Sequence, residues 1–180
     1  MVVNIVSCED FDLLFANFVQ DVLGLKQEQV LISYRERGQP SSVIAKDVCY
    51  VHTNLEDDEV QIFKNRKKSY DPETENVTIT QQAMRRIMLQ VVFYGPNSDV
   101  LSTTLNEYCY TEDAKQFFYN NDLALIPSLI SRPIKTHEKI NERWWERVDL
   151  KLRFYNSISV DTEVSTITST DIKIIHEREE

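Results

Sequence analysis

The chain has 180 residues, and we expect one domain over 1–180 with residues 176–180 as a flexible tail. Its 29 acidic and 20 basic residues give a net charge of −9, which disfavours binding to nucleic-acid phosphates as the main activity. Only three glycines are present, far apart at Gly24, Gly38 and Gly95. This spacing excludes the phosphate-binding loops of P-loop and Rossmann nucleotide sites.

Cysteine usage and hydropathy narrow the cellular setting. Cys8, Cys49 and Cys109 are odd in number and widely separated, so neither a disulfide framework nor a zinc knuckle is expected. The N-terminus lacks a basic segment followed by an apolar core, and no stretch approaches the ~20 apolar residues that span a bilayer. We therefore expect synthesis in a cytoplasm and no membrane contact.

The first predicted element is a helix, because apolar residues recur every three or four positions before Gly24. Ser7 and Asp10 resemble a capping box at its start, and Gly24 is well placed to end it. A β-branched run over 29–34 predicts a strand, and the stretch 35–42 predicts a loop.

An acidic cluster separates the next two predicted strands, over 43–55 and 60–70, which we interpret as a hairpin. Contiguous carboxylates at a hairpin tip are well solvated and lack the alternating ligand pattern of calcium loops. We interpret the cluster as an acidic loop with no catalytic or metal role, formed by Glu56, Asp57, Asp58 and Glu59.

The most regular strand pattern runs over 84–94, where apolar residues alternate with mixed ones up to Gly95. Asn97 or Ser98 then caps a second helix, and Thr111 starts a third, shorter one. We expect the second helix to bury a stripe composed of Val100, Leu101, Thr104, Leu105 and Tyr108.

Two further strand patterns follow, over 148–155 and within 160–175. Residues 150–156 repeat the in-and-out pattern of residues 89–95, so these two segments are expected to be neighbours in one sheet. The sequence predicts an α+β fold, with an antiparallel or mixed β-sheet and two or three helices packed on one face.

A basic stretch stands out in this acidic chain. In a strand, Lys64, Arg66 and Lys68 share one face. We interpret them as a charged sheet edge that blocks stray pairing, or as a contact for an acidic partner protein.

Both tryptophans of the chain stand side by side at the start of a predicted strand. Pleating sends Trp144 and Trp145 to opposite faces, so that one can enter the core and the other cannot. An exposed tryptophan flanked by Arg143 and Arg147 has the composition of an interface hot spot. The alternative is that Trp145 rests beside the chain's own helices, and the sequence favours neither interpretation.

No spacing of catalytic or metal-ligating residues is present. His52, His137 and His176 stand alone, so no metal site and no cofactor are expected. A Cys109 nucleophile with His137 as base remains possible only if the two meet in space, and a cysteine among aromatic residues is usually packing. We expect no enzymatic activity.

The order of these elements resembles the neck and tail terminator proteins of tailed bacteriophages over most of residues 9 to 175. The tightest parts are the strand that ends in Phe93, Tyr94 and Gly95, and the strand entry Arg143-Trp144-x-x-Arg147. The polar stretch 64–79 departs from the pattern.

This resemblance implies a virion protein of the neck, in a ring of about six copies on the end of the tail tube. Such a ring ends tube growth and gives the head-completion or connector protein something to bind. DNA only passes through its channel, for which a negative surface, including the acidic loop, is suitable. The resemblance thus predicts three kinds of partner, namely further copies, the tail tube protein and a head-completion or connector protein.

A second class of function fits the same composition. A small acidic phage-encoded adaptor that binds a host or viral protein as a monomer or dimer would also lack catalytic motifs. Neighbouring head and tail genes would favour the first reading, and early regulatory genes the second.

Overall fold

The computed structural model describes residues 2–4, 7–33, 46–57, 65–71, 76–140 and 142–165. Within them, the elements in chain order are β1 Val2–Asn4, α1 Cys8–Leu23, η1 Gln27–Gln29, β2 Val30–Ile32, β3 Val48–Glu56, β4 Asn65–Asp71, β5 Asn76–Tyr94, α2 Ser98–Tyr108, α3 Glu112–Asn120, β6 Leu123–Leu125, η2 Pro127–Leu129, β7 Ile134–Ile140 and β8 Arg143–Ser165. The predicted loop 35–42 and tail 176–180 lie outside the described residues, as do Lys64, Asp58 and Glu59.

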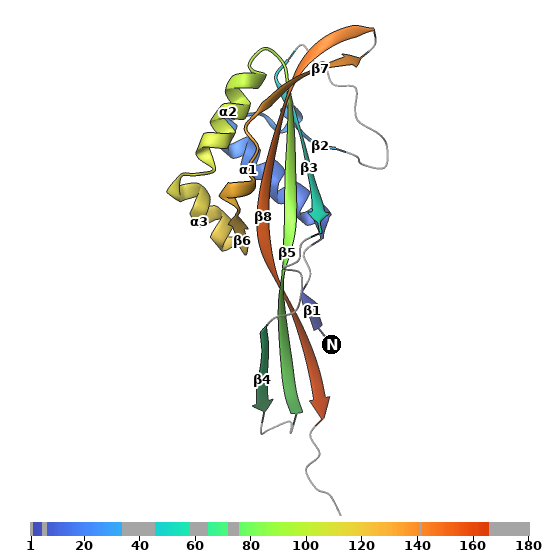
Figure 1. The fold of residues 1–180 in the computed structure, drawn as a ribbon, viewed down its shortest axis with the longest axis vertical. Coiled ribbons are helices and arrows are strands. Elements are labelled where there is room, and N and C mark those ends of the chain that lie inside the picture. Colours follow the sequence, from blue (N-terminus) through green and yellow to red (C-terminus); the bar gives the residue numbers. More distant parts are fainter. Residues whose placement is uncertain are drawn as a thin grey trace, which may run out of the picture.

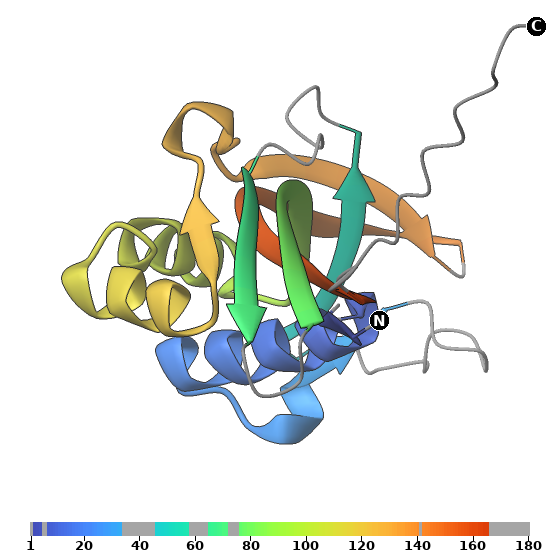
Figure 2. The ribbon, with the colours of Figure 1, turned by 90° about the horizontal axis from the view of Figure 1, so that it is seen from below.

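The strands form one mixed sheet with the order β1-β8-β5-β3-β2, in which β2 runs parallel to β3 and the other pairs are antiparallel. Figures 1 and 2 show α1, α2 and α3 beside this sheet. The core lies between the sheet and these helices and holds side chains from all three. The predicted α+β class is therefore confirmed.

The local signals at the ends of α1 act as the sequence predicts. Ser7 Oγ accepts a hydrogen bond from the Asp10 amide, and the Asp10 carboxylate accepts one from the Ser7 amide. Gly24 ends the helix in the left-handed region with φ 61°. The buried face of α1 carries Phe11, Phe15, Phe18 and Val19.

The central pair of the sheet is β5 and β8. Leu89 lies opposite Leu152 and Val91 opposite Leu150, so the two similar sequence segments are neighbours as predicted. All four side chains are fully buried on the face that meets the helices.

The predicted hairpin around the acidic cluster is wrong. β3 and β4 do not pair with each other. Both pair with β5, β3 along Arg86–Tyr94 and β4 along Asn76–Gln82. The reason is burial, since Cys49 and Val51 of β3 enter the helix-covered core, while β4 is polar and pairs with the part of β5 that lies beyond it.

The buried stripe predicted for α2 is also partly wrong. Leu105 is fully buried, and Leu101 and Tyr108 are partly buried and pack against the core. Val100 is 65% exposed, and Thr104 is exposed. Ser98 and Ser102 are buried instead, because small side chains let a helix pack closely against its neighbours. Val100 and Thr104 are thus left on the outer side of α2.

Candidate interaction surfaces

The two tryptophans lie in the hairpin of β7 and β8, where Trp144 is opposite Lys139 and Trp145 is opposite Glu138. Trp144 is 69% exposed, and Trp145 is partly exposed. The expectation that one tryptophan enters the core is wrong, because the buried part of β8 begins only at Val148. The indole ring of Trp144 is therefore available to a partner, and that of Trp145 only in part.

Arg147 and Arg143 were predicted to flank an interface tryptophan. The guanidinium of Arg147 donates to Asp149 at 2.7 and 2.6 Å and to Glu138 at 3.2 Å. These bonds, first of all those to Asp149, raise the pKa of Arg147 above its ordinary value. The structure thus engages Arg147 within the chain, whereas Arg143 contributes the first residue of β8.

Tyr94 joins the same group from the central strand. Its hydroxyl donates to Glu138 Oε2 at 2.5 Å, so one carboxylate of β7 is held by residues of β5 and β8. Burial, followed by this bond to Glu138, raises the pKa of the Tyr94 hydroxyl. This network fixes the hairpin that carries the tryptophans against the sheet.

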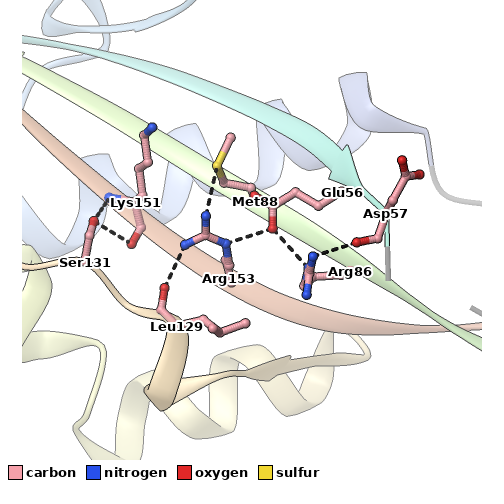
Figure 3. A network of polar contacts seen from close by, with 8 residues as sticks. All are labelled: Glu56, Asp57, Arg86, Met88, Leu129, Ser131, Lys151 and Arg153. Atoms are coloured by element: carbon pink, nitrogen blue, oxygen red, sulfur yellow. Dashed lines mark hydrogen bonds and ion pairs between the residues drawn. The ribbon is translucent and has the colours of Figure 1, made fainter. Parts of the chain in front are cut away.

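Glu56, predicted to lie in a solvated loop, is the last residue of β3 and lies opposite Arg86. Its Oε2 accepts a hydrogen bond from Arg153 Nε at 2.8 Å and forms an ion pair with Arg86 Nε at 3.0 Å (Figure 3). The hydrogen bond from Arg153 is the first cause that holds the pKa of Glu56 below its ordinary value. Since two cations surround this carboxylate, Glu56 adds little negative potential to the surface.

Glu56, Arg86 and Arg153 form a charged cluster, and both arginines also bond to backbone carbonyl oxygens. Arg86 Nη2 donates to the carbonyl oxygen of Asp57 at 2.6 Å, and Arg153 Nη1 donates to that of Leu129 at 2.8 Å. The cluster thereby ties the end of β3 to β5, β8 and the segment before β7. The side chain of Asp57 is exposed, so it is the described member of the acidic loop that faces solvent.

The predicted basic face is present in β4. Arg66 lies opposite Gln81 and Lys68 opposite Ile79, and both basic side chains are exposed. Because the two residues are separated by one position in a strand, they share a face. β4 runs along one edge of the paired β5 and β8, beyond the helices (Figure 1).

The alternative of a cysteine nucleophile is not supported. Cys109 is fully buried, and burial raises the pKa of its thiol to about 12. His137 lies on the exposed side of β7. Within the described ranges, no group of three or more His, Cys, Asp or Glu residues is placed to hold a metal ion. None of the described helices is long and apolar enough to cross a membrane.

Sequence reasoning missed two interactions within the chain, that of Arg147 with Asp149 and that of Glu56 with Arg153. A local signal exists for the first, since Arg147 and Asp149 are separated by one residue and therefore share a strand face. No local signal exists for the second, because Arg153 is 97 positions from Glu56.

Within the part of the chain that the structure describes, exposed aromatic and charged side chains lie on the β7–β8 hairpin and on the edge strand β4. The chain belongs to the phage neck terminator protein family, whose sequence model matches residues 12–179. The resemblance found in the sequence is thereby confirmed. A comparison with curated proteins gives no match.

Proposed function

We propose that this phage neck protein forms a ring of about six copies that caps the tail tube, ends tube growth and joins the tail to the head connector. The single observation that carries this proposal is family membership over residues 12–179, which includes nearly the whole described fold. The protein acts as a structural component of the virion and performs no catalysis.

A ring requires two different patches on each subunit, because its contacts are heterologous. We propose the β7–β8 hairpin, with Arg143, Trp144, Trp145 and Arg147, as one contact surface toward a further copy, the tube protein or the connector. The basic group Lys64, Arg66 and Lys68 is proposed as a second contact surface. The exposed Trp144 ring supports the first assignment, since large aromatic side chains anchor many protein interfaces.

The net charge of −9 supports a channel through which DNA slides. A negatively charged channel wall binds DNA phosphates only weakly, so that DNA can slide through the channel. We propose that the acidic loop of Glu56, Asp57, Asp58 and Glu59 faces this channel, with Asp57 and not the paired Glu56 as its main described charge.

Native mass spectrometry tests the proposal, over a range of protein concentrations and with or without purified tail tubes. The expected result is a closed oligomer near six copies, alone or on the tubes. A second readout is tube length, because adding the protein to polymerising tube protein should stop growth. A monomer or dimer that ignores tubes would overturn the ring and favour the adaptor alternative.

A further inference from the structure

The paired strands β5 and β8 continue well beyond the helices. They remain in register over all 19 residues of β5, from Tyr94 opposite Arg147 to Asn76 opposite Ser165. In Figure 1 the lower part of this ladder, together with β4 and β1, extends as an arm below α3 and β6. The arm therefore presents sheet faces that no described helix of the same chain covers.

One face of the arm is apolar and basic. Strand alternation places Val77 and Ile79 on the side of the sheet that carries the core in the body, and Val164 is opposite Val77. Val164 is 44% exposed and Tyr70, also opposite Val77, is 55% exposed. We call this the arm face, and it consists of Arg66, Lys68, Tyr70, Val77, Ile79, Val160 and Val164.

A surface of matching character lies on α2. Val100, Thr104 and Tyr108 follow each other at intervals of four residues and form a stripe along the helix. Asp99, Thr103 and Glu107 form a parallel stripe beside it. Together with Thr111 these six residues line an open, mostly apolar hollow of about 590 Å³, which we call the α2 hollow.

The two surfaces are complementary in charge and in length. The arm face carries two exposed cations beside its apolar column, and the α2 hollow carries Glu107 and Asp99 beside its own. Asp99 already forms an ion pair with Lys135 Nζ of the same chain at 3.1 Å, so Glu107 is the main charge that the hollow offers to the arm. From Val100 to Tyr108 the helix rises about 12 Å. From Arg66 to Tyr70, the part of the arm face in β4, the strand rises about 13 Å.

These surfaces cannot meet within one chain. Figure 1 shows α2 toward one end of the molecule and the arm at the other end. We infer that the arm face of one subunit packs into the α2 hollow of a second copy of this chain. The inference rests on the proposed ring and identifies one of its contacts, since joining two different patches of identical subunits is the heterologous contact that a ring requires.

Charge reversal tests the contact, with native mass spectrometry as the readout in the presence and absence of tail tubes. The arm variant is R66E/K68E and the hollow variant is T103K/E107K, and all four residues are exposed. Each variant alone is expected to raise the dissociation constant of assembly at least tenfold, because like charges then face each other. An equimolar mixture of the two variants should recover assembly, since each altered arm then faces an oppositely altered hollow.

K67E is the matched control, because Lys67 is also an exposed cation of β4 but lies on the opposite face of the arm from Lys68. It should assemble like the unaltered protein, and circular dichroism should show that all variants are folded. Normal assembly of either double variant would overturn the inference, and so would a mixture that fails to recover. An arm variant that forms rings but no longer binds tubes would assign the arm to the tube protein instead. The proposed ring would be rejected only if the unaltered protein did not assemble.

Discussion

Asp12 of α1 accepts two hydrogen bonds from Thr53 of β3, one from its amide at 2.6 Å and one from its hydroxyl at 2.7 Å. Both residues are buried, and they are 41 positions apart in the chain. This carboxylate thus joins the first helix to the sheet at a point where the Thr53 amide would otherwise lack an acceptor.

Replacing Asp12 should therefore be costly. We expect D12A to lower the free energy of unfolding by about 2–3 kcal/mol, because the buried Thr53 amide is left without its acceptor, while the Thr53 hydroxyl keeps the Cys8 carbonyl oxygen at 3.0 Å. D12N keeps an acceptor and should cost less. Urea denaturation measures both, with D21A on an exposed position of the same helix as the control, for which a change within about 0.5 kcal/mol is expected. Equal losses for D12A and D21A would contradict the role of Asp12.

Acid should remove the stabilisation that Glu56 provides. Its pKa in the folded protein lies below the ordinary value of 4.5, so its contribution is present above 4.5 and disappears as the pH falls through the folded pKa. At pH 7 we expect E56Q to be less stable by about 1 kcal/mol, a value discounted for solvent screening. Urea titrations from pH 7 down to pH 3 should show this difference shrinking below pH 4.5. A difference that stays constant would show that Glu56 is not favoured as the anion by Arg153 and Arg86.

Thiol reactivity should separate the three cysteines. Burial raises the pKa of the Cys49 and Cys109 thiols to about 12, whereas Cys8 is partly exposed. A thiol reagent at pH 8 should modify Cys8 alone in the native protein and all three cysteines in urea. Rapid native modification of Cys109 would reopen the possibility of a nucleophilic role.

Trp144 should contribute to assembly and not to the free energy of unfolding. Because Trp144 is largely exposed, W144A should change the free energy of unfolding by no more than about 0.5 kcal/mol. If the indole side chain of Trp144 anchors a contact between subunits, W144A should weaken assembly tenfold or more. Native mass spectrometry and thermal unfolding on one preparation give both quantities. Unchanged assembly would remove Trp144 from the proposed interface, and Y119A, which truncates an exposed aromatic residue of α3, is the control.

Two glycines give a paired test of backbone packing. A Cβ at Gly95, where φ is 107°, would lie 2.7 Å from the Asp47 Cα, but a Cβ at Gly24 would meet nothing within 4 Å. G24A should cost about 1 kcal/mol for the left-handed backbone alone. G95A should cost distinctly more, because the segment after β5 must also move away from Asp47. Chemical denaturation that ranks the two in the opposite order would contradict this account.

Prediction from the sequence succeeded where the signal is local. The alternation through Ile87, Leu89 and Val91 and the caps of α1 at Ser7 and Gly24 each depend on neighbours within a few residues. Strand pairing failed, because β3 pairs with a segment about 40 positions away and the acidic residues between β3 and β4 gave the pattern of a tight turn.

For the candidate surfaces too, features with a local sequence signal were predicted and features that depend on long-range contacts were not. Periodicity found α2 and its buried Leu105, but it placed Val100 in the buried stripe and missed the small buried residues Ser98 and Ser102. The basic face of Arg66 and Lys68 followed from alternation alone. The strand patterns over 148–155 and within 160–175 were predicted separately. Their union in one strand, β8, that pairs with β5 from Asn76 onward could not be predicted, because it depends on contacts between segments far apart in the sequence.

The uninterrupted ladder between β5 and β8 has a mechanical consequence. The hydrogen bonds that hold the arm and those that hold the centre of the core belong to one pair of strands, with no break in register between them. A pull along the arm is therefore carried as shear by many backbone hydrogen bonds at once, and the arm has no hinge in these two strands. A neighbour bound to the arm would thus be attached to the same two strands that form the centre of the core of this subunit.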